Sequence, residues 1–245
     1  MEPKIGLQLY SVGQQMQEDA YGTLQKVAKA GFETVEFAGL YGYSPKEMGK
    51  MLRDVGLTPI SSHSDVLNNL EREVENMLEL DVHQIVLPHH PFENKEAVLR
   101  LADTMNQAGR YCKEQGMQLG YHNHSHEFFP TSYGKLIHKE IEERCPDVEF
   151  ELDTFWVFNA NLDPIAEIER LKDRVRVIHL KDGIHSGDGS HHAQGKSVGE
   201  GKAPIKAIRE KALELGILMV IESEGLDPTG TEEVGRCIKY LRTLD

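Results

Sequence analysis

Four clusters of polar side chains follow apolar runs in this chain, at points where buried strands would end. They lie at residues 121–127, 151–153, 178–182 and 221–224, and they contain histidines, aspartates and glutamates. A mixed set of imidazoles and carboxylates of this kind is what a divalent metal requires. The clusters therefore predict a metal-dependent enzyme whose site gathers residues from distant parts of the sequence.

The elements that must position these clusters recur along the chain as an amphipathic helix, a glycine and then an apolar strand. The glycines are Gly31, Gly56, Gly116 and Gly216. Because glycine suits the left-handed position just past a helix C-terminus, each of them marks the end of a helix and the start of a strand.

Eight strands are predicted between these helices, and their interiors are rich in branched apolar residues, as expected for strands covered by helices. This alternation predicts a single-domain (β/α)8 barrel over residues 1–245, close to the roughly 250 residues typical of that fold. A doubly wound open sheet is the alternative, but no G-x-G-x-x-G motif follows the first strand. The predicted strands are residues 5–11, 34–39, 58–64, 84–89, 117–123, 148–153, 175–180 and 217–223.

The composition of the chain indicates which classes of binding partner are expected. A net charge of −13 disfavours nucleic acid, because binding it requires lysines and arginines that neutralise phosphates. No apolar run approaches the roughly 20 residues of a membrane span, and the N-terminus lacks the pattern of a signal peptide, which predicts a cytoplasmic protein. Cys112, Cys145 and Cys237 are widely separated and odd in number, so neither disulfides nor a thiolate zinc site is expected.

Three residues at predicted strand ends are the first candidates for metal ligands, because a barrel builds its active site at the C-terminal ends of its strands. Asp153 and His179 each lie at the end of an apolar strand, and Glu222 follows an apolar run where a buried carboxylate without a cation would be costly. Asp153 could instead cap a helix, and His179 could be a hydrogen-bonded core histidine. We predict that all three bind one divalent metal.

The segment from residue 121 to 128 offers three candidates for a fourth ligand. His122 and His124 share one strand face, and Glu127 follows just beyond. We favour Glu127. Three carboxylates and one imidazole then make an oxygen-rich site that suits Mn²⁺, with Mg²⁺, Co²⁺ or Zn²⁺ as alternatives. His122 and His124 would then serve as acid or base. Lys181 would neutralise an oxyanion, although an ion pair with Asp182 is the rival interpretation.

Seven short motifs span nearly the whole chain, at residues 7–11 (LQLYS), 35–39 (VEFAG), 121–128 (YHNHSHEF), 152–156 (LDTFW), 179–182 (HLKD), 199–201 (GEG) and 221–222 (IE). In order and spacing they resemble the sugar phosphate isomerase/epimerase family of the xylose isomerase-like TIM barrels. The resemblance implies a metal at the barrel mouth, with Asp153, His179 and Glu222 at ligand positions. Many members of that family carry a glutamate near the place of His122, so either His122 replaces it or Glu127 supplies the carboxylate.

Three other residues are candidates for binding the sugar. The resemblance makes Glu36 and His63, at the ends of the second and third strands, sugar contacts, with ordinary polar strand ends as the alternative. Trp156 is expected to stack on a sugar ring or to pack in the core.

These observations predict a sugar isomerase or epimerase in which the metal polarises a carbonyl so that a neighbouring C–H becomes removable. Glu222, Glu127 or one of His122 and His124 would move the proton. The alternative is a lyase or dehydratase that acts on keto sugars, keto inositols or 3-keto glycosides. An abasic-site endonuclease is disfavoured by the acidic balance, and a non-catalytic sugar-binding barrel would retain no metal. A homo-oligomer is compatible with the composition, which does not set the oligomeric state.

Two loops extend the prediction. The segment 183–203 has six glycines and no strand or helix periodicity, and we expect it to be a mobile loop over the site. The loop after the eighth strand, residues 222–233, is acidic and would repel a phosphate dianion, although Lys196 and Lys202 could offset this repulsion. The substrate is therefore expected to be an uncharged sugar or glycoside.

Overall fold

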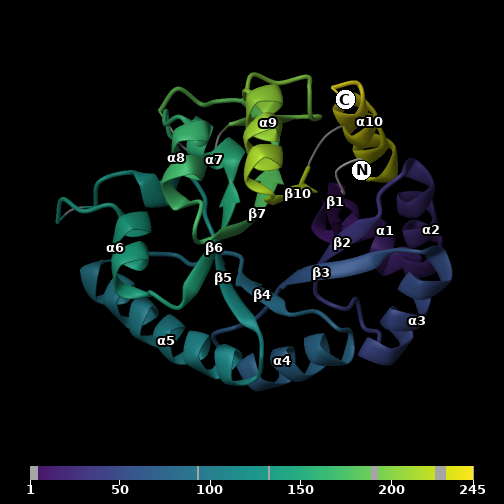
Figure 1. The fold of residues 1–245 in the computed structure, drawn as a ribbon, viewed down its shortest axis with the longest axis horizontal. Helices are drawn as coiled ribbons and strands as arrows, with labels where there is room; N and C mark the ends of the chain where they lie inside the picture. The colour runs from purple at the N-terminus through teal and green to yellow at the C-terminus, as the bar shows by residue number, and fades with distance from the viewer. Residues whose placement is uncertain (1–4, 93, 132, 189–192, 224–229, 245) are drawn as a thin grey trace.

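Eight parallel strands close into a barrel, which confirms the predicted (β/α)8 fold (Figure 1). The computed structural model describes residues 5–92, 94–131, 133–188, 193–223 and 230–244. Strand β1 pairs with both β2 and β10, and this double pairing closes the ring. The barrel strands are β1 (Ile5–Gln8), β2 (Thr34–Ala38), β3 (Thr58–His63), β4 (Gln84–Leu87), β5 (Gln118–His122), β6 (Val148–Asp153), β7 (Val175–Leu180) and β10 (Leu218–Ile221).

Helices follow the strands and surround the barrel (Figure 1). Gly31, Gly56 and Gly216 cap their helices in the left-handed conformation, as the sequence predicts. The α-helices are α1 (Gly13–Glu18), α2 (Ala20–Ala30), α3 (Pro45–Val55), α4 (Leu70–Glu79), α5 (Lys95–Glu114), α6 (Ile137–Arg144), α7 (Thr154–Asn159), α8 (Pro164–Leu171), α9 (Ile205–Leu215) and α10 (Thr231–Arg242); 3-10 helices cover Leu9–Val12 (η1) and His126–Phe128 (η2).

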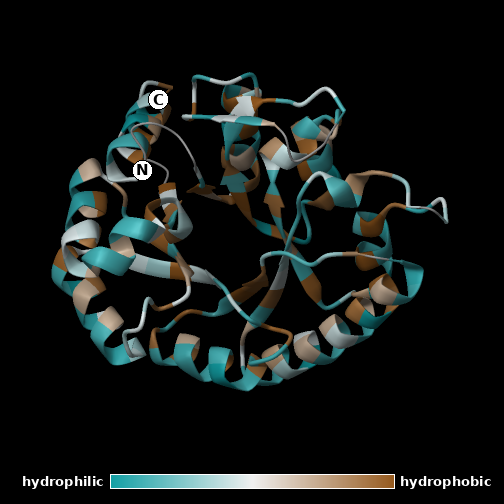
Figure 2. Ribbon diagram, turned by 180° about the vertical axis from the view of Figure 1, so that it is seen from behind, coloured by the Kyte–Doolittle hydropathy of each residue, from teal (hydrophilic) through white to brown (hydrophobic). Residues whose placement is uncertain are grey.

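The hydrophobic core lies between the strands and the helix ring. Helix side chains such as Leu24, Met48 and Met105 are fully buried there against the strands. Figure 2 shows hydrophobic residues concentrated on the strands and hydrophilic residues along the outer helices. Both faces of each barrel strand are buried, so the strand sequences are rich in apolar residues. Polar residues are therefore easy to recognise where an apolar stretch of sequence ends.

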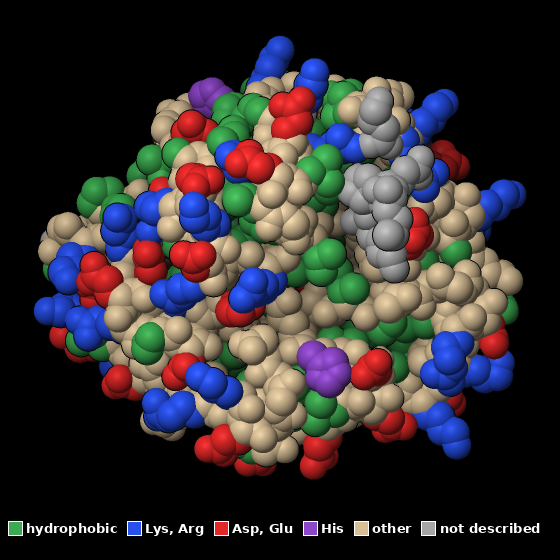
Figure 3. Space-filling view, viewed as in Figure 1, with side chains coloured by type: hydrophobic (Ala, Val, Ile, Leu, Met, Phe, Trp, Pro, Cys, Tyr) green, Lys and Arg blue, Asp and Glu red, His purple; other side chains and the backbone are tan. Residues whose placement is uncertain are grey.

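Charged side chains of both signs are interspersed on the face shown in Figure 3. Within the described residues, no helix combines the length and the apolar character needed to cross a membrane.

The segment between β7 and α9 contains a small sheet, so the expectation of a loop without strands was wrong. Strands β8 (Asp182–Ile184) and β9 (Gln194–Lys196) pair antiparallel. The Asp182 carboxylate accepts backbone N–H bonds from Gly183, Gly199, Gly201 and Ala203 at 2.8–3.0 Å. These bonds provide hydrogen-bond acceptors for backbone N–H groups of the segment. The hydrophobic periodicity of the sequence does not indicate them. His191 and His192 lie outside the described residues.

A buried histidine on α6 should make the stability of the fold depend on pH. The His138 ring lies between Phe128 and Phe150, with centroids 4.6 and 4.7 Å away, and burial lowers its pKa from 6.5 to about 3. As the pH falls below 6.5 the unfolded chain takes up this proton first, so stability is lost progressively down to about pH 3. In His138→Phe, the slope of the unfolding free energy against pH between 6 and 4 should fall by about 1.4 kcal/mol per pH unit. Urea titrations of both proteins at several pH values check this, and equal slopes would contradict it.

Candidate metal centre

The C-terminal ends of the barrel strands direct a set of polar side chains toward one mouth of the barrel. His122 stands opposite Glu151 in the pairing of β5 with β6, and Asp153 stands opposite His179 in the pairing of β6 with β7. Glu222 follows β10 directly. All five side chains are buried, although they come from segments up to 100 residues apart in the sequence (His122 to Glu222).

Four of these residues form a first group, here called the mouth group: His122, Asp153, His179 and Glu222. Each offers one ligand atom, and the four atoms all lie within 4.8 Å of one another. His179 Nδ1 is 3.2 Å from Glu222 Oε2, and His122 Nε2 is 4.0 Å from Asp153 Oδ2. The structure therefore brings together three of the four predicted ligands, with His122 in the fourth place.

Glu127, favoured from the sequence as the fourth ligand, lies outside this group. Its Oε1 accepts a hydrogen bond from the Tyr121 hydroxyl at 2.8 Å, and its Oε2 accepts one from the backbone N–H of His124 at 2.9 Å. Burial raises the pKa of Glu127 to about 8. Both carboxylate oxygens thus hold the turn η2 against β5, because the chain bends into a 3-10 turn just after the strand.

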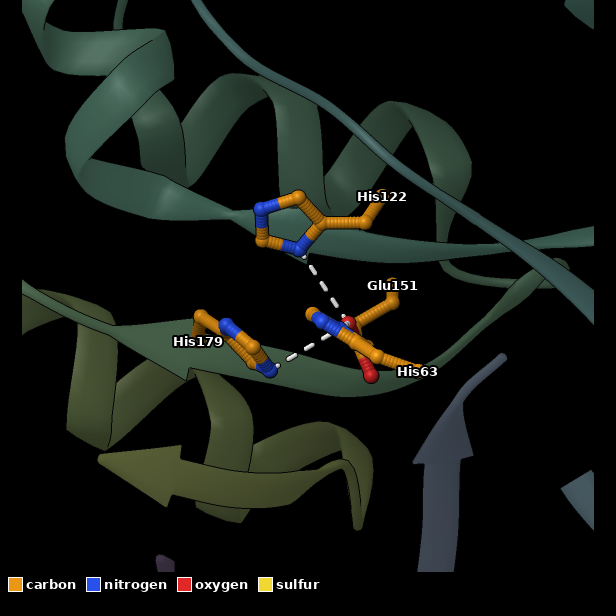
Figure 4. A group of neighbouring side chains, drawn as sticks. All are labelled: His63, His122, Glu151 and His179. Carbon is orange, nitrogen blue, oxygen red and sulfur yellow. Dashed lines mark hydrogen bonds and ion pairs between the residues drawn. The ribbon is translucent and has the colours of Figure 1, made fainter. Parts of the chain in front are cut away.

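A second group, here called the deep group, consists of His63, His122, Glu151 and His179, whose ligand atoms also lie within 4.8 Å of one another. Glu151 Oε2 is 2.6 Å from His63 Nε2, 3.1 Å from His122 Nδ1 and 3.2 Å from His179 Nε2. Figure 4 shows the three imidazoles pointing at this carboxylate. Glu151 was not selected as a site residue from the sequence, but it lies two residues before Asp153, and strand alternation places such residues on one face.

Glu36, expected to contact the sugar, is fully buried beside the deep group. Its Oε1 is 2.8 Å from His179 Nε2 and accepts a hydrogen bond from Gln8 Nε2 at 2.5 Å, and its Oε2 accepts one from the Ser61 hydroxyl. Burial, followed by the charge of Glu151, raises the pKa of Glu36 to about 7. Glu36 is therefore placed to brace His179 from inside the barrel.

A cavity of about 670 Å³ opens over the mouth group. Its lining includes His63 of the deep group and two residues of the mouth group, His122 and Glu222. The other lining residues are Tyr10, Ala38, Gly39, Ser64, Asp65, Leu67, Asn68, Leu87, Pro88, His89, His124 and Lys181.

The mouth group fits a divalent cation. Asp153 Oδ1 accepts the Trp156 N–H at 3.0 Å and caps α7, so the capping interpretation is correct for this oxygen. Asp153 Oδ2 is buried without a hydrogen-bond partner among the described residues. Burial raises the pKa of Asp153 to about 7, and the nearby charge of Lys181 offsets only part of this effect. Two imidazoles and two carboxylates are a donor set that first-row divalent metals accept.

Lys181 is buried beside the mouth group rather than paired with Asp182. Its Nζ lies 3.7 Å from Glu222 Oε2 and 5.0 Å from the centroid of the Trp156 ring. The His124 ring packs on Trp156 with centroids 5.6 Å apart, and burial lowers the pKa of His124 to about 2. Trp156, 7% exposed, thus supports Lys181 and His124 from behind and is absent from the described lining of the cavity.

Curated proteins that are similar in sequence match part of this chain. A curated inosose dehydratase from Geobacillus kaustophilus (strain HTA426) is 32% identical over 83 residues, which are 34% of this chain and 26% of that protein. A second, from Mesomycoplasma hyopneumoniae (strain 7448), is 26% identical over 187 residues, which are 73% of this chain and 59% of that protein. The matched regions therefore leave a large part of both relatives uncovered.

A solved structure resembles nearly the whole chain. The sugar phosphate isomerase/epimerase from Parabacteroides distasonis ATCC 8503 superposes with a TM-score of 0.79 at 29% identity, covering 99% of this chain and 94% of that one. The model of the xylose isomerase-like TIM barrel family matches residues 24–244. The chain belongs to the xylose isomerase-like TIM barrel family.

Proposed function

We propose that this protein is a metal-dependent sugar isomerase or epimerase that moves a proton next to a carbonyl group. The observation that carries the proposal is the mouth group at the base of an open cavity, with the buried ammonium group of Lys181 beside Glu222. His122, Asp153, His179 and Glu222 would hold the metal, which when bound would supply a Lewis acid for the substrate carbonyl. The two imidazoles and two carboxylates admit Mn²⁺, the metal expected from the sequence, as well as Co²⁺ or Zn²⁺.

Lys181 and His124, which also lie at the mouth of the barrel, would take part in the reaction. Lys181 carries positive charge to a buried position, where it stabilises negative charge that develops on a sugar oxygen. His124 lines the cavity beside the His122 ring, with centroids 5.1 Å apart, so its imidazole is placed to accept a proton from a molecule bound in the cavity. We assign the charge stabilisation to Lys181 and the proton transfer to His124.

A lyase or dehydratase that acts on a keto sugar, keto inositol or 3-keto glycoside is the second candidate. It would share the first proton removal and then expel a group from the next carbon. The similarity to inosose dehydratases supports it. His124, which lines the cavity, also supports it, because a histidine that removes a proton can return it to the departing group.

A screen in D₂O would test the proposal and separate the two candidates. Keto and aldo sugars would be incubated with the Mn²⁺-loaded protein and followed by NMR and mass spectrometry. Deuterium uptake at the carbon next to the carbonyl, without loss of water or another group, is the result expected of an isomerase or epimerase. Uptake accompanied by elimination favours the lyase. The Asp153→Asn protein serves as the control, and equal exchange with that variant would refute a metal-dependent reaction.

The substrate is expected to lack a phosphate group. Among the described residues that line the cavity, Lys181 is the only lysine or arginine, and Glu222 lies 3.7 Å from it. Lys196 and Lys202 are absent from this lining, and residues 224–229 of the acidic loop after β10 lie outside the described residues. A phosphate dianion near Glu222 and Asp65 would be repelled, so kcat/KM should be at least about tenfold higher for a sugar than for its phosphate. A preference for the phosphorylated partner would contradict this expectation.

A further inference from the structure

The mouth group and the deep group share His122 and His179, and they use opposite nitrogens of each ring. His122 turns Nε2 toward Asp153 and Nδ1 toward Glu151. His179 turns Nδ1 toward Glu222, and its Nε2 lies 2.8 Å from Glu36 Oε1 and 3.2 Å from Glu151 Oε2. Each imidazole is therefore clamped between a carboxylate of the mouth group and the same buried carboxylate below it.

A neutral imidazole has one nitrogen with a lone pair and one that carries a proton. A metal takes the lone pair, so the opposite N–H needs an acceptor. If both rings bind a metal in the mouth group, the N–H of His122 is on Nδ1 and that of His179 is on Nε2. Both of these nitrogens face Glu151 Oε2, at 3.1 and 3.2 Å. Each neutral ring has only one lone pair. A metal bound to both His122 and His179 therefore lies either in the mouth group or in the deep group, and not in both.

We propose that Glu151 is a positioning residue that holds His122, and together with Glu36 also His179, in the tautomer needed to bind metal at the mouth. Glu151 reaches both rings, because β6 carries it two residues before the ligand Asp153 and opposite His122 on β5, and Glu36 is the second acceptor for His179. His63 supports this arrangement by placing Nε2 2.6 Å from Glu151 Oε2. The inference rests on the metal at the mouth group and not on which sugar reaction follows.

The ring nitrogens themselves provide the direct test. In protein loaded with Zn²⁺, which is diamagnetic, two-bond ¹H–¹⁵N NMR correlations distinguish a metal-bound nitrogen from a protonated one. We expect the metal on Nε2 of His122 and on Nδ1 of His179, with the protons on the opposite nitrogens. The reverse pattern would place the cation in the deep group with Glu151 as a ligand, and it would overturn the proposal.

The substitution Glu151→Gln gives the second test. The amide cannot accept an N–H through its nitrogen and carries no charge, so metal affinity should fall by about 10- to 100-fold, the usual effect of losing an outer-shell carboxylate. Competition with a chelator measures the dissociation constant for Mn²⁺ without any substrate, so the result does not depend on the proposed reaction. In the zinc-loaded variant the correlations of His122 should also show mixed tautomers, whereas His179 keeps Glu36 Oε1 as an acceptor at 2.8 Å.

Glu149→Gln is the matched control, because Glu149 lies on the same strand and pairs with the exposed Arg176 at 3.3 Å instead of with a histidine. Its metal affinity should equal that of the wild type. Thermal denaturation of the metal-free proteins separates misfolding from weak binding, and the circular dichroism spectrum should be unchanged in both variants. A folded Glu151→Gln protein with wild-type affinity and unmixed tautomers would refute the positioning role.

Discussion

Asp153→Asn should release the bound metal and lower kcat/KM by about three orders of magnitude, since it removes both an anionic ligand and the Lewis acid it holds. Asparagine is chosen because it caps helices as well as aspartate does, so the N-cap of α7 at Trp156 N is preserved. The variant therefore separates the ligand role of Oδ2 from the capping role of Oδ1. The metal-to-protein ratio after dialysis, measured by elemental analysis, checks the result. Full metal content in Asp153→Asn would mean that the mouth group is not the metal site.

The same measurement decides between His122 and Glu127 as the fourth ligand. His122→Ala should lose most of the metal, because it removes a donor nitrogen from the mouth group. Glu127→Gln should keep the metal, because both oxygens of Glu127 are already hydrogen-bonded to Tyr121 and to the backbone of His124. If Glu127→Gln releases the metal and His122→Ala retains it, the assignment made from the sequence is correct and the one made from the geometry fails.

The positions of the strand ends could be predicted from the sequence because each buried strand is an apolar run that stops at a polar residue. This rule placed Asp153, His179 and Glu222 correctly at one mouth, since the C-terminal ends of parallel strands meet there. The rule applies only to residues that lie within an extended strand or directly at its end. Glu127 lies past the end of β5, inside the turn η2, and no periodicity indicates where the side chain of such a turn points.

Glu151 was missed for a different physical reason. It lies in the interior of β6 and is fully buried, and a carboxylate in such a place is costly unless something compensates it. Here three imidazoles lie around Glu151 Oε2, and they come from β3, β5 and β7. These imidazoles are distant from Glu151 in the sequence. Only the closed barrel shows that they compensate the buried carboxylate. Asp182 lies in the motif HLKD, but its carboxylate accepts four backbone N–H bonds from its own loop and so stabilises that loop.

Lys181→Met should lower kcat by about 100- to 1,000-fold while the metal stays bound, because the substitution removes a preorganised charge from the place where negative charge develops. Methionine keeps the length and apolar character of the side chain, so its packing against Trp156 is retained, where Lys181 Nζ is 5.0 Å from the ring centroid. KM should change much less than kcat, since an interaction made mainly in the transition state contributes little to substrate binding. Lys202→Met is the control, because Lys202 is an exposed lysine absent from the described lining of the cavity.

The outcome also tells what the lysine does. If Lys181 acted only by balancing Glu222, at 3.7 Å, its loss would raise the negative charge of the mouth group and strengthen metal binding without slowing the reaction. If it stabilises charge on the sugar, the rate of deuterium uptake must fall together with kcat, because both pass through the same proton removal. A kcat within about threefold of the wild type, with tighter metal binding, would assign Lys181 to the metal site alone.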